Sequence, residues 1–267
     1  MKRLVILGGG ESGVGAALLG KQKGSGVFVS DRGSIAKKYK KVLLHNEILF
    51  EEKQHTESLI LNADVVVKSP GIPEKAPIVQ QLIYNGVLVI SEIEFGSKYT
   101  DALIIGITGS NGKTTTTLIT HHLLKSAKIN VGVAGNIGAS FAQQIAEENF
   151  ESYVLELSSF QLDGVIDFRP HIAIITNITP DHLDRYEYDF NQYVASKFTI
   201  TRNQTIHDFL IYDADDQTID NWLKKNQTNA ALIPFSIEKE LDYGAFLRED
   251  TIIIKLNTEE FSMSISN

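Results

Sequence analysis

The sequence contains no cysteine, which excludes disulfides, thiolate metal sites and cysteine nucleophiles together. The same absence suits a reducing compartment, so we expect a cytoplasmic protein. Long apolar runs are also missing, and no stretch approaches the ~18 residues that a membrane span needs. The apolar run Leu4–Leu7 behind Met1-Lys2-Arg3 is too short for a secretory signal. We therefore expect no membrane partner.

Basic residues are the minority charge. The chain has 25 lysines and arginines against 33 acidic residues, a net charge of −8, which argues against a general nucleic-acid binder. A single loop is enough to bind phosphates, so nucleotides are not excluded. The remaining composition, 43% hydrophobic and 22% charged, is that of a globular protein, and 267 residues correspond to one or two domains.

Short apolar runs alternate with helical patterns, which predicts an α/β protein with repeated βα units over parallel sheets. Glycine-rich turns near residues 8 and 109 suggest two domains, 1–98 and 99–267, divided in the polar stretch Ser97–Asp101. The stretch Tyr243–Asn267 looks like strands without a closing helix, as if the chain were cut inside a domain. The predicted strands are Leu4–Leu7, Val27–Ser30, Ile48–Glu51, Val65–Lys68, Val87–Ile90, Leu103–Thr108, Val131–Ala134, Tyr153–Leu157, Ile172–Thr176, Phe209–Tyr212, Ala231–Pro234 and Thr251–Leu256.

The first glycine loop contains the pattern Gly-x-Gly-x-x-Gly within Gly8–Gly13, between a strand and the helical pattern Val14–Lys21. Such a loop makes a tight turn and aims helix N-terminal amides at a phosphate. Asp31 ends the second strand, where a dinucleotide fold puts its ribose-binding acid. Taken alone, the pattern favours a nicotinamide enzyme. A glycine turn that binds nothing, or a loop for another nucleotide, remains an equal alternative.

The second loop, Gly106–Thr115, is the stronger signal. Lys113 follows a glycine and precedes Thr114, as in loops whose amides cradle phosphates, whose lysine reaches the terminal ones and whose hydroxyl meets Mg²⁺. Strict Walker spacing fails, because Ile107 stands where a glycine is required. The β-branched run before the loop and the helix-like Thr115–Ser126 after it supply the expected context. A plain glycine turn with an exposed lysine is the alternative.

The segment Thr108–Thr114 resembles the ATP loop of the Mur ligases and the folylpolyglutamate synthetases. The string LELSSFQL at Leu155–Leu162 is the most discriminating piece, and it is similar to that of the Mur ligases that add D-glutamate. Residues 1–97 argue against the synthetases, which start at the ATPase domain. Three further segments share the resemblance: Ser69-Pro70-Gly71-Ile72, Gly135-Asn136-Ile137-Gly138 and Asp181-His182-Leu183-Asp184-Arg185-Tyr186.

The resemblance implies a Rossmann-like domain followed by a phosphate-loop ATPase domain. It also implies a monomeric ATP-dependent ligase that joins D-glutamate to UDP-N-acetylmuramoyl-L-alanine through an acyl phosphate, in peptidoglycan precursor synthesis. Members of the family carry a third, C-terminal domain that binds the amino acid and closes over ATP. Nothing in Tyr243–Asn267 resembles it, so we expect the 267-residue chain to be an inactive fragment.

The resemblance also assigns residues to sites. It implies that the first glycine loop binds the UDP end of the substrate and not NAD. Catalytic roles fall to Lys113, His182 and Lys197. The ATP loop would be Gly109, Ser110, Asn111, Gly112, Lys113, Thr114 and Thr115. The UDP-linked substrate would meet Gly10, Glu11, Ser12, Gly13, Asp31, Arg32, Ser69, Pro70, Gly71, Asn136 and Ser158. Two Mg²⁺ ions are implied, one held by Thr114 and Glu156 and the other by His182 and a carbamate formed from CO₂ on Lys197.

Three of these side chains have plainer interpretations from the residues alone. Glu156 at a strand end could be a cap or a salt-bridge partner, and His182 could be structural or exposed. Lys197 lies in an amphipathic stretch and could be a surface lysine with a buried stem. Because imidazole is an unusual magnesium ligand, Asp181 and Asp184 could instead orient His182. A nicotinamide oxidoreductase and a non-catalytic nucleotide-binding module remain the competing classes.

Overall fold

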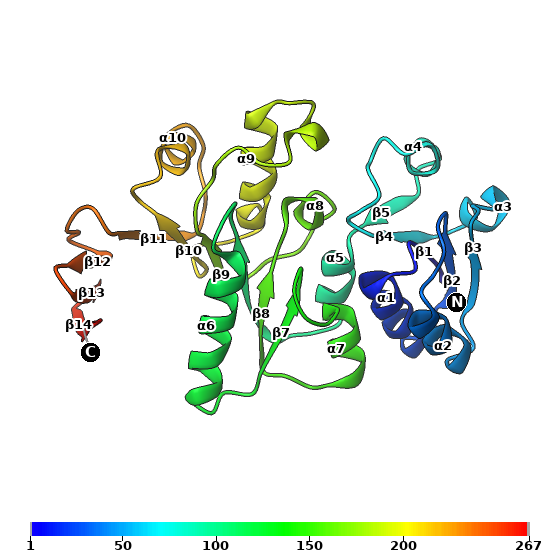
Figure 1. Ribbon diagram of the computed structural model, residues 1–267, viewed down its shortest axis with the longest axis horizontal. Coiled ribbons are helices and arrows are strands. Elements are labelled where there is room, and N and C mark those ends of the chain that lie inside the picture. Colours follow the sequence, from blue (N-terminus) through cyan, green and yellow to red (C-terminus); the bar gives the residue numbers. More distant parts are fainter. Residues whose placement is uncertain (1, 266–267) are drawn as a thin grey trace.

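The computed structural model describes residues 2–265 and arranges them as two α/β units side by side (Figure 1). The first unit is built on five parallel strands in the order β3-β2-β1-β4-β5. Every predicted strand of this unit is present, with its ends displaced by at most one residue. The elements of this unit are β1 (Arg3–Leu7), α1 (Glu11–Gln22), β2 (Gly26–Asp31), α2 (Lys37–His45), β3 (Leu49–Glu52), α3 (Glu57–Ile60), β4 (Val65–Lys68), α4 (Pro77–Tyr84) and β5 (Leu88–Ile90).

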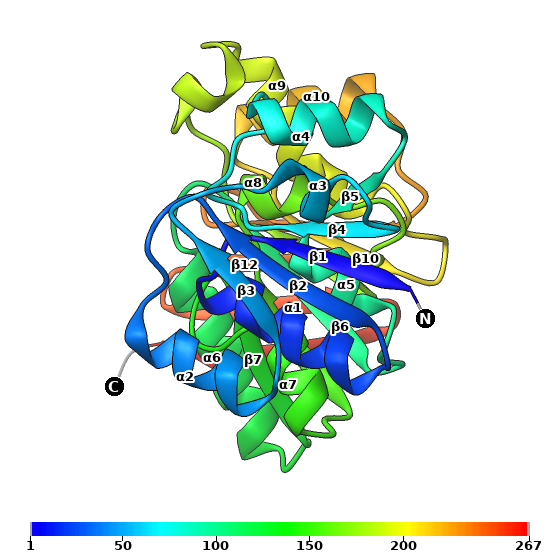
Figure 2. The ribbon, with the colours of Figure 1, turned by 90° about the vertical axis from the view of Figure 1, so that its right-hand side faces the viewer.

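Both faces of this sheet are covered, as the continuous apolar run of β1 requires. Leu4 and Ile6 face a cluster with α1, whereas Val5 and Leu7 face the cluster under α3 and α4. Figure 2 shows the sheet between α1 and α2 on one side and α3 and α4 on the other. The alternation of side chains along one strand therefore builds two cores.

The second unit carries a nine-stranded sheet in the order β14-β13-β12-β11-β10-β9-β6-β8-β7. Its strands are β6 (Leu103–Thr108), β7 (Val131–Gly135), β8 (Ser152–Glu156), β9 (Ile172–Ile175), β10 (Phe209–Asp213), β11 (Ala231–Ser236), β12 (Gly244–Arg248), β13 (Thr251–Leu256) and β14 (Glu259–Ser264). Its helices are α6 (Lys113–Ser126), α7 (Phe141–Glu147), α8 (Ser159–Leu162), α9 (Phe190–Phe198) and α10 (Gln217–Lys225), with 3₁₀ turns η1 (Leu183–Tyr186) and η2 (Thr199–Thr201).

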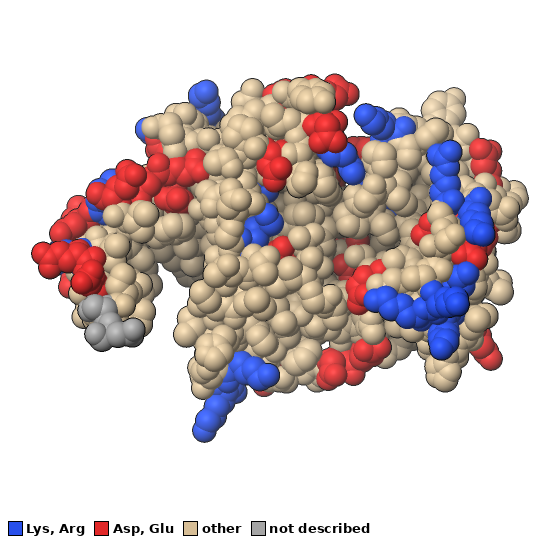
Figure 3. Space-filling view, viewed as in Figure 1, with Lys and Arg blue, Asp and Glu red and all other residues tan. Residues whose placement is uncertain are grey.

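The expectation of a parallel sheet is confirmed for β6 to β12, and it is wrong for β13 and β14. β12, β13 and β14 pair antiparallel, because short turns rather than helical crossovers connect them. Only β13 was predicted as a separate strand within the strand-like C-terminal stretch, whose last two residues lie outside the described part. Acidic side chains gather around these strands, on the left of Figure 3.

A short helix, α5 (Glu92–Ser97), lies where the two units meet, together with α7. Gly15 of α1 packs so closely on α7 that a Cβ there would lie 1.9 Å from Ser140 Oγ. The buried Glu92 accepts hydrogen bonds from Ser140 Oγ and the Ala142 amide, both at 2.6 Å, and burial raises the pKa of its carboxyl. We propose residue 98 as the end of the first domain, because the chain passes from α5 to the second sheet there.

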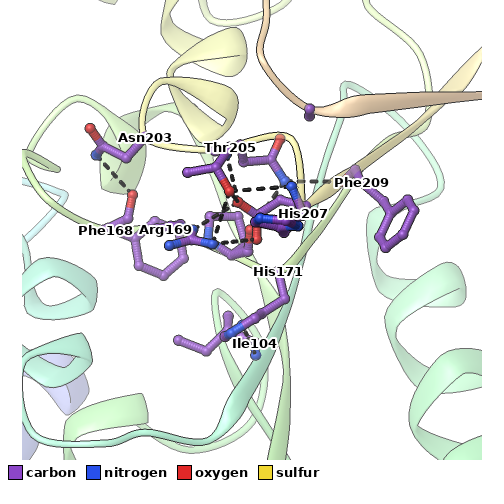
Figure 4. A network of polar contacts seen from close by, with 12 residues as sticks. Ile104, Phe168, Arg169, His171, Asn203, Thr205, His207 and Phe209 are labelled. Carbon is purple, nitrogen blue, oxygen red and sulfur yellow. Dashed lines mark hydrogen bonds and ion pairs between the residues drawn. The ribbon is translucent and has the colours of Figure 1, made fainter.

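A polar network ties the starts of β9 and β10 together, at the opposite edge of the sheet from the strand ends considered below (Figure 4). Arg169 donates to both carboxylate oxygens of Asp208, at 2.8 and 3.1 Å, and Thr205 donates to the same carboxylate. His171 Nδ1 accepts from the Ile104 amide at 3.2 Å. These contacts give this edge of the sheet a structural role.

Within residues 2–265, no helix is long and apolar enough to cross a membrane.

Candidate nucleotide site

The carboxyl ends of β6, β8 and β9 meet at one edge of the second sheet. β6 lies between β9 and β8, so the connections on its two sides run in opposite directions. Open α/β sheets bind their ligands at such a switch point. The loop Gly109–Gly112 leaves β6 there, and α6 begins at Lys113. The predicted strand, glycine loop and helix are therefore all present.

The loop is held in shape by positive φ angles and by the segment after β9. Gly109 has φ +149°, and a Cβ there would lie 1.9 Å from Thr176 Oγ1. The Ser110 hydroxyl donates to the Thr179 carbonyl at 2.8 Å, and the Asn111 amide donates to Asn177 Oδ1 at 2.9 Å. Only glycine fits at position 109, because a side chain there would clash with Thr176 just after β9.

The buried Glu156 sits at the end of β8, with 1% of its surface exposed. Its Oε2 accepts from Thr114 Oγ1 and its Oε1 accepts from Asn136 Nδ2, each at 2.7 Å. The backbone of Gly135, at φ +106°, comes so close that a Cβ there would lie 2.2 Å from the Glu156 carbonyl oxygen. The structure thus brings Thr114 and Glu156, which were predicted to bind metal, together with Asn136, which was predicted to bind substrate.

These oxygens fit a magnesium ion that keeps most of its ligands as waters and phosphate oxygens. Among residues 2–265 no group of three or more histidine or acidic side chains is placed to hold a metal by itself. The Thr114 hydroxyl in the first turn of α6 and the Glu156 carboxylate at the end of β8 nevertheless supply hard oxygen donors of the kind Mg²⁺ prefers. The donor set therefore fits an ion bound jointly by protein and nucleotide.

Lys197 of α9 is buried, with 2% of its surface exposed, so the interpretation of a surface lysine is wrong. Its Nζ donates to the Gly109 carbonyl at 2.7 Å and lies 4.6 Å from the centre of the Tyr193 ring. Burial, followed by the charge of Lys113, lowers the pKa of Lys197 to about 7. An amine with that pKa is substantially neutral at physiological pH.

His182 is largely exposed and has the left-handed backbone angle φ +49°. Its Nε2 lies 3.5 Å from Asp181 Oδ2, and its ring centre lies 5.5 Å from that of Phe160. Asp181 also accepts from the His182 amide at 2.9 Å, so it orients both backbone and ring. No contact joins His182 to Lys197 in the described part of the chain.

The first glycine loop stands at the end of β1 and is organised by Asp31. The carboxylate of Asp31 accepts from the amides of Gly9 and Gly33, each at 2.6 Å. A Cβ on Gly13 would lie 1.9 Å from the Gly8 carbonyl, so the helix start requires glycine. Glu11 accepts from Tyr39 at 2.5 Å, and Arg32 is exposed. The assignment of Asp31 to the UDP-linked substrate stays a prediction; in the structure one of its oxygens holds Gly9 of the loop and the other holds Gly33 after β2.

Ser69 of the loop after β4 lies against the first glycine loop, where a Cβ on Gly8 would meet Ser69 Oγ at 2.4 Å. Ser158 instead forms a capping box on α8 with Gln161. Sequence reasoning missed Tyr193, whose hydroxyl lies 3.0 Å from Ser110 Oγ. Its spacing of four residues from Lys197 on one helix was the available signal, because such residues share a face.

The parallel sheet, the glycine loop with its lysine and the buried carboxylate on the next strand define a nucleotide-binding α/β protein. Comparison with known sequences specifies the family. Residues 107–266 match the Mur ligase middle domain, and residues 3–78 match the MurD N-terminal domain. The chain therefore belongs to the Mur ligase family.

Curated relatives agree with this assignment. UDP-N-acetylmuramoylalanine–D-glutamate ligase of Christiangramia forsetii is 56% identical over 265 residues, covering 99% of this chain and 60% of the relative. The protein of the same name from Bacteroides thetaiotaomicron is 54% identical over 254 residues, covering 95% of this chain and 57% of the relative. The chain thus spans somewhat under two thirds of the length of these relatives.

Solved structures support the fold. The UDP-N-acetylmuramate:L-alanyl-γ-D-glutamyl-meso-diaminopimelate ligase of Neisseria meningitides superposes with a TM-score of 0.65 at 20% identity, covering 97% of this chain and 86% of that one. The UDP-N-acetylmuramate–alanine ligase of Thermotoga maritima gives 0.57 at 19% identity, covering 100% of this chain and 61% of that one. The predicted fold class is confirmed.

Proposed function

We propose that this chain is the UDP-substrate-binding and ATP-binding part of a ligase that joins D-glutamate to UDP-N-acetylmuramoyl-L-alanine. One observation carries the proposal: Lys113, the Thr114–Glu156 pair and Lys197 converge on a single glycine loop. The names and high identity of the relatives support the choice of substrate. We further propose that the protein is monomeric and works in the cytoplasm, where its ATP-dependent reaction would supply peptidoglycan precursors.

In the proposed reaction the terminal carboxylate of UDP-N-acetylmuramoyl-L-alanine takes the γ-phosphoryl group of ATP, and the amine of D-glutamate then displaces phosphate. Bound Mg²⁺ would neutralise charge on the transferred group. The loop amides of Gly109–Gly112 would cradle the phosphates, and Lys113 would move from the loop carbonyls to phosphate oxygens. Thr114 and Glu156 would hold the ion, and Asn136, fixed on Glu156, would face the reacting carboxylate.

We propose that Lys197 carries a carbamate that contributes to a second magnesium site with His182. The neutral amine attacks CO₂, a carbon–nitrogen bond forms and one proton is released. The resulting carbamate has two oxygens that share one negative charge, whereas the unmodified lysine has no oxygen to offer a metal. The depressed pKa of Lys197 favours this step, because the amine must first lose its proton.

The UDP end would lie over the first sheet, at the loop Gly10–Gly13. The sheet order and the glycine loop after β1 fit a diphosphate held at the N-terminus of α1. Asp31 would fix this loop, and Ser69–Gly71 would contact the substrate from the other side of the UDP site. A nicotinamide enzyme would use the same loop, but nothing at the second site serves hydride transfer.

Two measurements test the proposal. Calorimetry compares UDP-N-acetylmuramoyl-L-alanine with NAD, and we expect only the UDP compound to bind. The complete gene product is then assayed for ADP release with ATP, Mg²⁺, the UDP substrate and D-glutamate. Tighter binding of NAD, or ADP release that does not depend on D-glutamate, would overturn the assignment.

A further inference from the structure

One arginine of the second unit reaches the substrate loop proposed for the first unit. Arg185 lies in the 3₁₀ turn η1, three residues after His182. Its Nη2 donates to the Pro70 carbonyl at 3.1 Å. The same guanidinium lies over the Phe160 ring, with its carbon 4.3 Å from the ring centre. A planar guanidinium can stack on a ring and donate hydrogen bonds in its own plane at once.

The contact fixes the orientation of a peptide plane. Because the Pro70–Gly71 peptide is trans, its N–H points away from the carbonyl that Arg185 binds. The rest of the loop is also held: the Ile72 amide donates to the Ser69 carbonyl at 3.0 Å, and Lys68 donates to the Ile72 carbonyl at 2.7 Å. The Gly71 amide has no acceptor among residues 2–265.

Two cations thus hold the carbonyls of one short loop. Burial, and then the nearby charge of Arg185, lowers the pKa of Lys68. The carboxylates of Asp163 and Glu74 act in the opposite direction and compensate part of this positive charge. The loop also lies against Gly8 of the first glycine loop, through Ser69. An anionic ligand at this place would accept a hydrogen bond from the free Gly71 amide.

We infer that Arg185 is a positioning residue, which holds the Gly71 amide toward the UDP-linked substrate and links that substrate to the turn carrying His182. The inference rests on the proposed function, because it takes the ligand to be a UDP-linked anion. Arg185 binds the loop through the Pro70 carbonyl, so we expect its loss to act on substrate binding through the loop. The ATP loop is held by other residues and should not respond.

The test compares Arg185→Ala with Arg202→Ala in the complete gene product. Arg185 and Arg202 line one cleft of about 750 Å³, but among residues 2–265 the Arg202 guanidinium donates only to the Val165 carbonyl, within its own unit. Calorimetry measures UDP-N-acetylmuramoyl-L-alanine and MgATP separately. We expect Arg185→Ala to weaken the UDP compound about tenfold, the effect of one hydrogen bond, and to leave MgATP unchanged. Arg202→Ala should change neither.

A second variant covers the case in which Arg185→Ala does not fold. Phe160→Leu keeps the arginine but removes the ring beneath it, and should weaken the UDP compound about two- to fivefold. Unaltered UDP affinity in a folded Arg185→Ala, or equal losses for both ligands, would overturn the inference and leave the proposed function standing. Failure of the unsubstituted protein to bind the UDP compound would instead overturn the proposed function.

Discussion

Lys113 and Lys197 donate to the same acceptor, the Gly109 carbonyl, at 2.9 and 2.7 Å. Burial is the main cause that lowers the pKa of Lys197, which is the more enclosed of the two. The charge of the nearby Lys113 lowers that pKa further, because two nitrogens that share one acceptor oxygen lie close together. The glycine loop therefore also positions the Lys197 amine, which is substantially neutral at physiological pH.

The first prediction concerns the pH at which Lys197 takes up CO₂. Its pKa of about 7 means that the neutral amine becomes abundant between pH 6 and 8, whereas a lysine with the ordinary value near 10.5 would need a far more alkaline solution. With ¹³C-bicarbonate, we expect an NMR carbamate signal that rises over about pH 6–8 and then levels off.

The control for this experiment is Lys197→Met, which keeps a buried stem and should abolish the signal. Lys125→Met, at the end of α6, removes an exposed lysine and should not change the signal. A carbamate that persists in Lys197→Met would assign the modification to another residue. No signal at any pH with the unsubstituted protein would leave Lys197 an unmodified buried amine.

The second prediction concerns the magnesium site. Glu156→Gln keeps the size of the side chain but removes its charge, so it should weaken MgATP binding by about ten- to a hundredfold, the effect of one charge-assisted contact. Binding of ATP without Mg²⁺ should change little. Glu151→Gln is the matched control, because Glu151 stands just before the other end of β8. Equal MgATP affinities for the two variants would remove Glu156 from the metal site.

The third prediction concerns Asp31. Removing its carboxylate frees the amides of Gly9 and Gly33, so Asp31→Ala should loosen the first glycine loop and weaken UDP binding about ten- to a hundredfold. Asp64→Ala is the control, since Asp64 accepts from the Arg3 amide at the opposite end of the sheet. UDP titrations decide the matter. Unchanged affinity in Asp31→Ala would show that the loop holds its shape without this acid.

The sequence was sufficient for the two glycine loops and for every strand except β12 and β14, because apolar runs and glycines report on local structure. β12 (Gly244–Arg248) and β14 (Glu259–Ser264) were harder to predict, since their apolar patterns are weak. Both strands form by pairing antiparallel with β13. The burial of Lys197 has no local signature either. An amphipathic pattern gives the face of a helix but not what packs on it, here a carbonyl 88 residues away.

The part of the site built from backbone groups could not be predicted. The pattern around Asp31 gave no sign that the amides of Gly9 and Gly33 would donate to its carboxylate. Arg185 was noted only as part of a matching segment, since its partner is a carbonyl in the other unit. Backbone donors and acceptors are present at every residue, so only the fold determines which of them a side chain meets.

The last prediction concerns stability at the structural edge of the second sheet. Burial alone would raise the pKa of Asp208, but the hydrogen bonds from Arg169 and Thr205 outweigh it and hold that pKa below its ordinary value. A carboxyl with a depressed pKa in the folded state contributes stability that is fully present above its unfolded pKa of about 3.9 and is lost as the pH falls through the folded value.

Asp208→Asn should therefore lower the free energy of unfolding by about 1–3 kcal/mol at pH 7, because the buried carboxylate loses charge-assisted hydrogen bonds. The difference from the unsubstituted protein should shrink below about pH 4, where the native carboxyl also becomes protonated. Urea unfolding at several pH values measures it. Asp220→Asn is the control, because Asp220 forms an exposed pair with Lys224 on α10 and its loss should change stability little. A difference that stays constant down to pH 2 would mean that the charge of Asp208 does not stabilise this edge, and that shape alone accounts for its effect.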